Sequence, residues 1–243
     1  MSGLDVRQDG KTTIFTFNRL DRKNAINAEV ANALYEEFAK FDASDQRVAI
    51  ITGAGKHFSG GADLADLPVL WKALPTLGLR TEKPVICAVN GTCAGGAFVM
   101  AILSDLCVAA ETARFHYPEA QYGLTGGVIA SLAGRIPHKF AMEVMLLGRP
   151  VPAQRAYEMG FVNEVAPHGG ELEAALAMAR ELEDMAPLVL KTLKRFVNDT
   201  LLQSPAEKRA RAERELQVIT ASQDRVEGIA AFLEQRKGTF EGR

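Results

Sequence analysis

Short apolar segments alternate with amphipathic ones along the first half of the chain. Residues 12–17 (TTIFTF) alternate polar and apolar side chains, a pattern that predicts a strand. Residues 48–52 (VAIIT) and 84–89 (PVICAV) are almost wholly apolar and predict two more strands. Asn27 is a favourable N-cap for a helix. The apolar face of that helix comprises Val30, Leu34, Phe38 and Phe41.

The second half of the chain has a helical pattern. Before it, residues 96–103 predict a short apolar helix, and residues 106–110 and 113–117 predict two short strands. From residue 139 onward the periodicity is nearly all helical. Amphipathic, charge-rich segments cover residues 171–185, 188–202, 205–220 and 225–236. Because no low-complexity linker interrupts the chain, we expect one large domain or one domain with a small appendage.

Composition narrows the class of protein. Hydrophobic residues make up 47% and charged residues 24% of the 243 positions, which is ordinary for a globular protein. The net charge of −2 argues against nucleic acid as a partner. The longest apolar run, residues 94–103, is about half of a membrane span, and the N-terminus lacks the apolar core of a signal peptide. Three cysteines without a paired spacing predict free thiols. We therefore expect a cytoplasmic protein without a membrane partner.

Several common motifs are absent. The glycines at positions 53, 55 and 60 do not fit the dinucleotide-binding fingerprint, and His57 stands where a phosphate-binding loop needs Ser or Thr. The four histidines have no metal-ligand spacing, so we expect no metal site.

Two glycine-rich turns each follow an apolar strand. Residues 59–63 (SGGAD) follow the second strand, and residues 94–97 (AGGA) follow the third. Gly96 also opens the apolar helix, so its N–H is an unsatisfied first-turn donor at the positive end of the helix dipole. Two N–H groups converging from these turns would form an oxyanion hole.

Six segments, in order along the chain, resemble the crotonase (enoyl-CoA hydratase/isomerase) superfamily. They are NRLDRKNAIN, ITGAGKHFSGGADL, KPVICAVNGTCAGGAFVMAILSDLCVA, FHYPEAQYGL, GRPVPAQRAYEMGFVNEV and AFLEQRKGTF. The resemblance implies an α/β fold, a spiral of ββα units followed by helices that form trimers, often stacked into hexamers. It divides the chain into a core at residues 1–190 and a helical region at 191–243. It also implies acyl-CoA thioester substrates, with coenzyme A entering as part of the substrate and no separate cofactor.

The resemblance also assigns catalytic roles. The backbone N–H groups of Ala62 and Gly96 are the expected oxyanion donors, and Glu119 of the Pro-Glu pair is the expected base. A typical hydratase of the family has a second glutamate three residues after Gly96, where this chain has Val99. The turn after Glu119 is also about two residues shorter than usual and lacks a proline. If Glu119 is not the base, nearby His116, Tyr117 and Tyr122 are the other candidates.

Coenzyme A contacts are expected in three places. The resemblance assigns them to the turn after the first strand, to the loop around the second glycine turn and to the C-terminus. The residues concerned are Arg22, Lys23, Ala25, Phe58, Asp63, Leu64, Phe232, Arg236 and Lys237. In the family the C-terminal contacts are sometimes made by a neighbouring subunit.

One remaining glutamate favours double-bond isomerisation, since one base can remove a proton at Cα and return it at Cγ without a held water. Hydration of a 2-enoyl-CoA is the alternative within the class. Decarboxylation or C–C bond formation on a malonyl-type thioester is a third reading. A non-catalytic acyl-CoA-binding subunit is a fourth, which Val99 and the shortened turn both favour somewhat.

Overall fold

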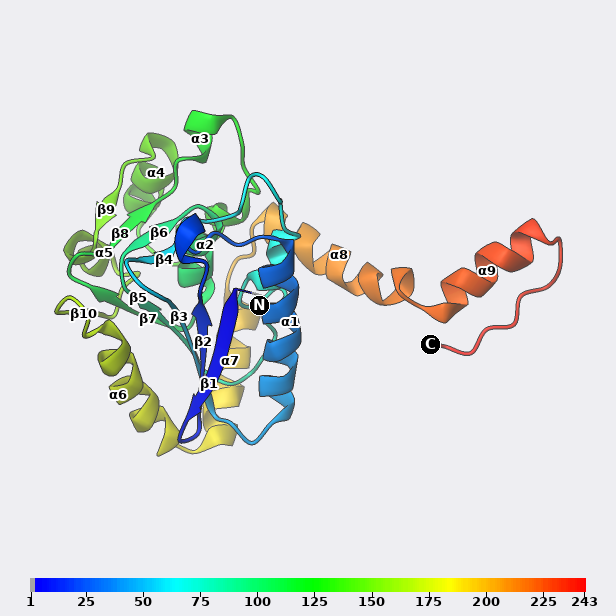
Figure 1. The fold of residues 1–243 in the computed structure, drawn as a ribbon, viewed down its shortest axis with the longest axis horizontal. Helices are drawn as coiled ribbons and strands as arrows, with labels where there is room; N and C mark the ends of the chain where they lie inside the picture. The colour runs from blue at the N-terminus through cyan, green and yellow to red at the C-terminus, as the bar shows by residue number, and fades with distance from the viewer. Residues whose placement is uncertain (1–2) are drawn as a thin grey trace.

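The strands form two β-sheets, and from β3 to β8 consecutive strands alternate between them (Figure 1). The computed structural model describes residues 3–243. The six-stranded sheet has the order β1-β2-β3-β5-β7-β10, and the four-stranded sheet has the order β4-β6-β8-β9. The strands are β1 (Leu4–Asp9), β2 (Thr12–Phe17), β3 (Val48–Gly53), β4 (His57–Ser59), β5 (Val85–Val89), β6 (Thr92–Ala94), β7 (Leu106–Ala110), β8 (Arg114–His116), β9 (Val151–Pro152) and β10 (Glu164–Ala166).

Each pair β3–β4, β5–β6 and β7–β8 places one strand in each sheet, so the chain winds as a spiral, as expected. The helices are α1 (Ala28–Ala43), α2 (Gly96–Leu103), α3 (Glu119–Tyr122), α4 (His138–Leu147), α5 (Ala153–Met159), α6 (Glu171–Glu183), α7 (Pro187–Thr200), α8 (Pro205–Thr220) and α9 (Gln223–Leu233). Three short 3-10 helices are η1 (Leu20–Arg22), η2 (Leu70–Ala73) and η3 (Val128–Gly134).

Parallel pairing explains why the large sheet is so apolar. β2, β3, β5, β7 and β10 run parallel in the order of the sheet, and both faces of the sheet are covered. On one face, α1 packs Phe38 against Phe15 with ring centroids 5.0 Å apart. On the other face, α6 packs Ala175 and Leu176 into a second apolar cluster. As predicted, Asn27 caps α1 by accepting from the backbone N–H of Val30 at 3.0 Å.

The structure corrects the expected elements in two regions. β1 pairs antiparallel with β2 over residues 4–17, although the sequence analysis placed only one strand there. The pattern after residue 139 predicts nearly all helix, yet this stretch contains β9 and β10. Both are very short, and β10 gains its partner only by pairing with β7, which lies far away in sequence. The expected boundary at residue 190 falls within α7.

The last two helices extend away from the body as an arm (Figure 1). Ser204 begins α8 with a capping box: its hydroxyl accepts from the N–H of Glu207 at 3.2 Å, and the Glu207 carboxylate accepts from the N–H of Ser204 at 2.8 Å. Glu207 is buried and lies 3.7 Å from Arg135 of the body. The base of the arm is therefore fixed by two kinds of polar contact.

Within residues 3–243, no helix combines the length and the apolar character that a bilayer span requires.

Candidate active site

Three parallel strands of the small sheet end side by side. Ser59 of β4 lies in register with Cys93 of β6, and Ala94 of β6 lies in register with His116 of β8. Because parallel strands present their carboxyl ends at one edge of a sheet, the segments that follow them meet there. These segments are the two glycine turns, at residues 59–63 and 94–97, and the Pro-Glu pair at residues 118–119.

The glycines let the two turns approach closely. Gly61 has φ +94°, and a Cβ built on it would lie 2.7 Å from the carbonyl oxygen of Ala94. Gly95 has φ +54°, and a Cβ there would lie 2.8 Å from Oε1 of Glu119. Only glycine fits both the left-handed backbone and the lack of space. The two turns and the glutamate therefore form one site.

The backbone around Ala62 leaves one donor outside the sheet. Ile26 donates its N–H to Gly61 O and accepts from the N–H of Asp63, both at 2.8 Å. In this parallel bridge the N–H of Ala62, the residue between them, points away from Ile26. Gly96 is the first residue of α2, where an N–H has no acceptor in the preceding turn.

Glu119 is half-buried at the start of α3. Its Oε2 atom is buried and has no hydrogen-bond partner among residues 3–243, and its Oε1 atom lies against Gly95. Burial raises the pKa of this carboxyl to about 7, because desolvation disfavours the charged form. A carboxyl group with this pKa exchanges a proton readily near neutral pH.

Apolar side chains border the same glycine. Val99 lies on the buried helix α2 and is 3% exposed. A Cβ on Gly96 would lie 2.8 Å from a methyl of Leu70, so η2 covers this turn. No carboxylate therefore stands at the position where the family places its second glutamate.

The three alternative bases are separated by the structure. His116 turns away, with Nε2 2.9 Å from the carbonyl oxygen of Gly148. Tyr122 is exposed. Tyr117 is buried, and its hydroxyl lies 2.9 Å from Oγ1 of Thr125. Burial raises the pKa of Tyr117, and the charge of Glu119 contributes to the rise. The side chains of His116 and Tyr117 thus contact different segments, at Gly148 and at Thr125.

Sequence reasoning missed Thr125 and Asn24. Thr125 also accepts from the N–H of Gly127 at 2.9 Å, so it organises the shortened turn. Asn24 is 1% exposed, has φ 56° and donates to the carbonyl oxygens of Ala54 at 2.9 Å and His57 at 2.6 Å. A buried asparagine beside the exposed Arg22 and Lys23 could not be recognised from the local polar pattern.

The structure brings the expected coenzyme A residues of the first turn next to the second glycine turn. The N–H of Gly60 donates to Lys23 O at 2.8 Å, and the Ile26–Ala62 bridge continues the contact beyond Ala25. The side chains of Arg22 and Lys23 are exposed beside this junction.

The residues of the second loop have different surroundings. Leu64 is exposed. Asp63 forms an ion pair with Arg19 at 3.0 Å, which holds the pKa of this carboxyl below its usual range. Phe58 is fully buried, and its ring packs edge-on against Phe17 with centroids 5.9 Å apart. The expected contact of Phe58 with coenzyme A is therefore wrong for its side chain, which belongs to the core.

Phe232 belongs to α9, and Arg236 and Lys237 follow that helix in the chain. α9 lies in the arm, away from the body that carries the glycine turns of the same chain (Figure 1). The three cysteines are buried free thiols, and burial raises the pKa of Cys87 to about 12.

Comparison with known proteins gives a consistent result. The sequence profile of the family described as "Enoyl-CoA hydratase/isomerase" matches residues 8–243. The chain is 32% identical to the 2,3-dehydroadipyl-CoA hydratase of Escherichia coli strain K12, with full coverage of both chains. It is 35% identical to the carnitinyl-CoA dehydratase of Salmonella typhi, over 99% of this chain and 98% of that protein.

Solved structures agree. An enoyl-CoA hydratase from Mycobacterium tuberculosis H37Rv has a TM-score of 0.77 and 35% identity, and a carnitinyl-CoA hydratase from Mycobacterium avium has a TM-score of 0.78 and 32% identity. Both comparisons cover all of both chains.

Proposed function

The chain belongs to the enoyl-CoA hydratase/isomerase family and is an acyl-CoA enzyme, and from its site we propose that it isomerises enoyl-CoA double bonds with Glu119 as its single base. Two features together carry the proposal. The carboxyl of Glu119 lies against Gly95, and position 99 holds an apolar residue, Val99. The carboxylate stands beside the two glycine turns, while the second family carboxylate is missing.

The proposed reaction needs one proton carrier. Glu119 removes a proton from C2 of a 3-enoyl-CoA. The electron pair of the broken C–H bond forms a C1–C2 double bond and the C1–O electrons move onto the thioester oxygen, which gives a dienolate conjugated with the C3–C4 double bond. The N–H groups of Ala62 and Gly96 donate to that oxygen. Glu119 then returns the proton at C4, leaving the double bond between C2 and C3. A preorganised donor of this kind contributes roughly 3–4 kcal/mol to lowering such a barrier.

The pKa of Glu119 supports both halves of the cycle. With a value of about 7, the carboxylate is basic enough to take the C2 proton and the acid is strong enough to deliver it. The rest of the substrate lies along Arg22, Lys23, Ala25 and Leu64, where two exposed cations face the phosphates of coenzyme A. In a trimer or hexamer, Phe232 and Lys237 contact the nucleotide part of the coenzyme A that is bound to a neighbouring subunit.

Hydration or dehydration is the second candidate, and the names of the relatives favour it. A hydratase must hold and orient a water molecule. Val99 cannot do so, but the hydroxyls of Tyr117 and Thr125, 2.9 Å apart, supply two polar groups only two and six residues from Glu119 along the chain.

A substrate panel distinguishes these functions. The purified protein is incubated in deuterium oxide with a 3-enoyl-CoA, a 2-enoyl-CoA, a 3-hydroxyacyl-CoA and a malonyl-type CoA. The proposal expects conversion of the 3-enoyl-CoA to the 2-enoyl-CoA faster than hydration of the latter. Faster hydration supports the second candidate, and loss of carbon dioxide supports decarboxylation. Tight binding without turnover of any thioester identifies a non-catalytic binding subunit.

A further inference from the structure

A second cleft, of about 600 Å³, lies between the C-terminal end of α1, the loop at residues 76–82, α7 and α8. Its walls carry six cationic side chains: Arg80, Lys191, Lys194, Arg195, Arg211 and Arg214. Three carboxylates accompany them: Asp42, Glu82 and Asp199. This cationic excess stands out on a chain whose net charge is −2, and it favours a negatively charged ligand.

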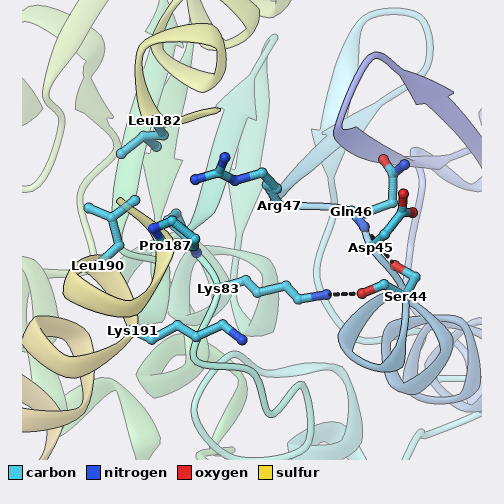
Figure 2. A pocket seen from close by; sticks show the side chains of 10 residues that line it. Ser44, Asp45, Gln46, Arg47, Lys83, Leu182, Pro187, Leu190 and Lys191 are labelled. Carbon is cyan, nitrogen blue, oxygen red and sulfur yellow. Dashed lines mark hydrogen bonds between the residues drawn. The ribbon is translucent and has the colours of Figure 1, made fainter. Parts of the chain in front are cut away.

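Part of the positive charge in the cleft is already neutralised. Lys194 pairs with Asp105 at 2.6 Å, and Arg195 pairs with Glu82 at 3.4 Å. The side chains of Arg80 and Lys191, in contrast, form no ion pair or hydrogen bond within residues 3–243, although the charge of Arg80 helps to lower the pKa of Glu215. Figure 2 shows Lys191 from an adjoining pocket, where its ammonium group ends without a partner among the side chains drawn. These two cations remain available to a ligand.

Two further donors in the wall lack partners. Oγ1 of Thr76 and Nε of Arg211 are buried and form no hydrogen bond within the described chain. The terminal nitrogens of Arg211 lie 2.7 and 3.1 Å from the amide oxygen of Gln203, so only Nε is left over. Thr76 also has φ +64°, a strained backbone for a β-branched residue. Strained residues and unsatisfied donors cluster at ligand sites.

A hydrogen bond links two walls of the cleft. Nη1 of Arg214 donates to the carbonyl oxygen of Leu77 at 2.5 Å, which ties α8 to the loop. The cleft is also remote from the proposed active site. Asn27 at one end of α1 lies next to Ile26 of the Ala62 turn, whereas Asp42 near the other end lines the cleft. A helix of 16 residues separates the two sites by roughly 24 Å.

From the unpaired cationic side chains, the unsatisfied donors and the volume of the cleft, we propose that it binds a small phosphate-bearing anion. Phosphate oxygens accept several charge-assisted hydrogen bonds at once, which matches a wall of guanidinium, ammonium and hydroxyl donors. The proposal does not depend on the reaction assigned to Glu119.

Calorimetric titration of the full-length protein with inorganic pyrophosphate, at fixed ionic strength, tests the proposal. We expect one site per chain, and binding that persists when coenzyme A is saturating. Arg80→Gln and Lys191→Gln should each weaken binding by about tenfold, since each removes a charged donor. Arg180→Gln on α6, an exposed cation paired with Glu173 outside the cleft, is the matched control and should change nothing.

Thr76→Gly separates a ligand role from a structural one. The substitution relieves the left-handed strain, so the melting temperature should stay the same or rise, while pyrophosphate binding should weaken severalfold because a donor is lost. Absence of binding overturns the proposal. It is also overturned if coenzyme A displaces pyrophosphate and Arg22→Gln abolishes binding, because the anion then occupies the coenzyme A site. Unchanged pyrophosphate binding in both Arg80→Gln and Lys191→Gln also overturns the proposal.

Discussion

The carboxyl of Glu119 and the methyls of Val99 set the chemistry at the scale of single residues. One oxygen of Glu119 lies against Gly95, and the other is buried with no hydrogen-bond partner in the described part of the chain. Val99 fills the neighbouring position with an apolar side chain that is almost wholly buried. The proposed site therefore has one group that can carry a proton, and its surroundings favour the neutral form of that group.

Val99→Glu should increase hydration of a 2-enoyl-CoA, because it restores a carboxylate that can hold water. Val99→Gln introduces a side chain of nearly the same shape as glutamate but without the charge, and it serves as the control. Both variants bury a polar group and should lose about 1–3 kcal/mol of stability. The measurement is the hydration rate under conditions where both variants are folded and bind coenzyme A. No gain for Val99→Glu over Val99→Gln would mean that more than one carboxylate is missing.

The rate should also depend on pH through Glu119. A base must be ionised, so kcat/KM should rise as the pH increases through about 7 and then level off. Stability should move in the opposite direction. The pKa of Glu119 is higher in the folded state than its usual 4.5, so the stability contributed by this group is complete below pH 4.5 and is lost as the pH rises through about 7.

Thermal melting of Glu119→Gln against the wild type checks this second effect. The variant cannot ionise, so it should gain in melting temperature relative to the wild type as the pH rises from 4.5 to about 7. A constant difference across this range would show that burial does not shift the pKa of Glu119.

At the scale of elements, the sequence predicted the glycine turns better than their surroundings. The apolar strands and the residues Gly61 and Gly95 were readable because burial and tight turns leave a local pattern. The burial of Phe58 was not readable, because only the packing of Phe17 from another strand determines it. The Tyr117–Thr125 contact and β10 could not be predicted for the same reason, since each depends on a partner from another part of the chain.

The base of α8 supports a prediction about stability. Ser204→Ala removes one half of a buried capping box and should cost about 1 kcal/mol of unfolding free energy. Ser222 caps α9 in the same way, accepting from the N–H of Arg225 at 3.1 Å, but at an exposed position on the arm. Ser222→Ala should affect the unfolding of the body less. Equal losses in denaturant titrations of the two variants would argue against an anchoring role for Ser204.

The whole molecule leaves a large apolar surface on its last three helices. α7 has an apolar face but no buried residue in the single chain. Exposed apolar side chains continue along the arm: Leu216, Val218, Ile219, Val226, Ile229, Phe232 and Leu233. Contiguous apolar surface of this kind marks an interface between proteins. The proposed trimer or hexamer would cover it.

Light scattering at micromolar concentration should therefore give three or six times the chain mass of 26.3 kDa. Leu193→Asp on α7, at a position that is 56% exposed in the single chain, should lower that mass without unfolding the body. A monomeric wild type would contradict the assembly, and it would remove the proposed contacts of Phe232 and Lys237 with a neighbouring subunit.

Exchange of the C2 proton of an acyl-CoA with deuterium oxide tests the role of Glu119 most directly, because it requires proton removal but no completed reaction. Glu119→Gln should lower the exchange rate by about 10²–10⁴-fold, the usual contribution of a general base. Affinity for the thioester should change little, since the nucleotide binds elsewhere. If Glu119→Gln exchanges the C2 proton as fast as the wild type, Glu119 is not the base.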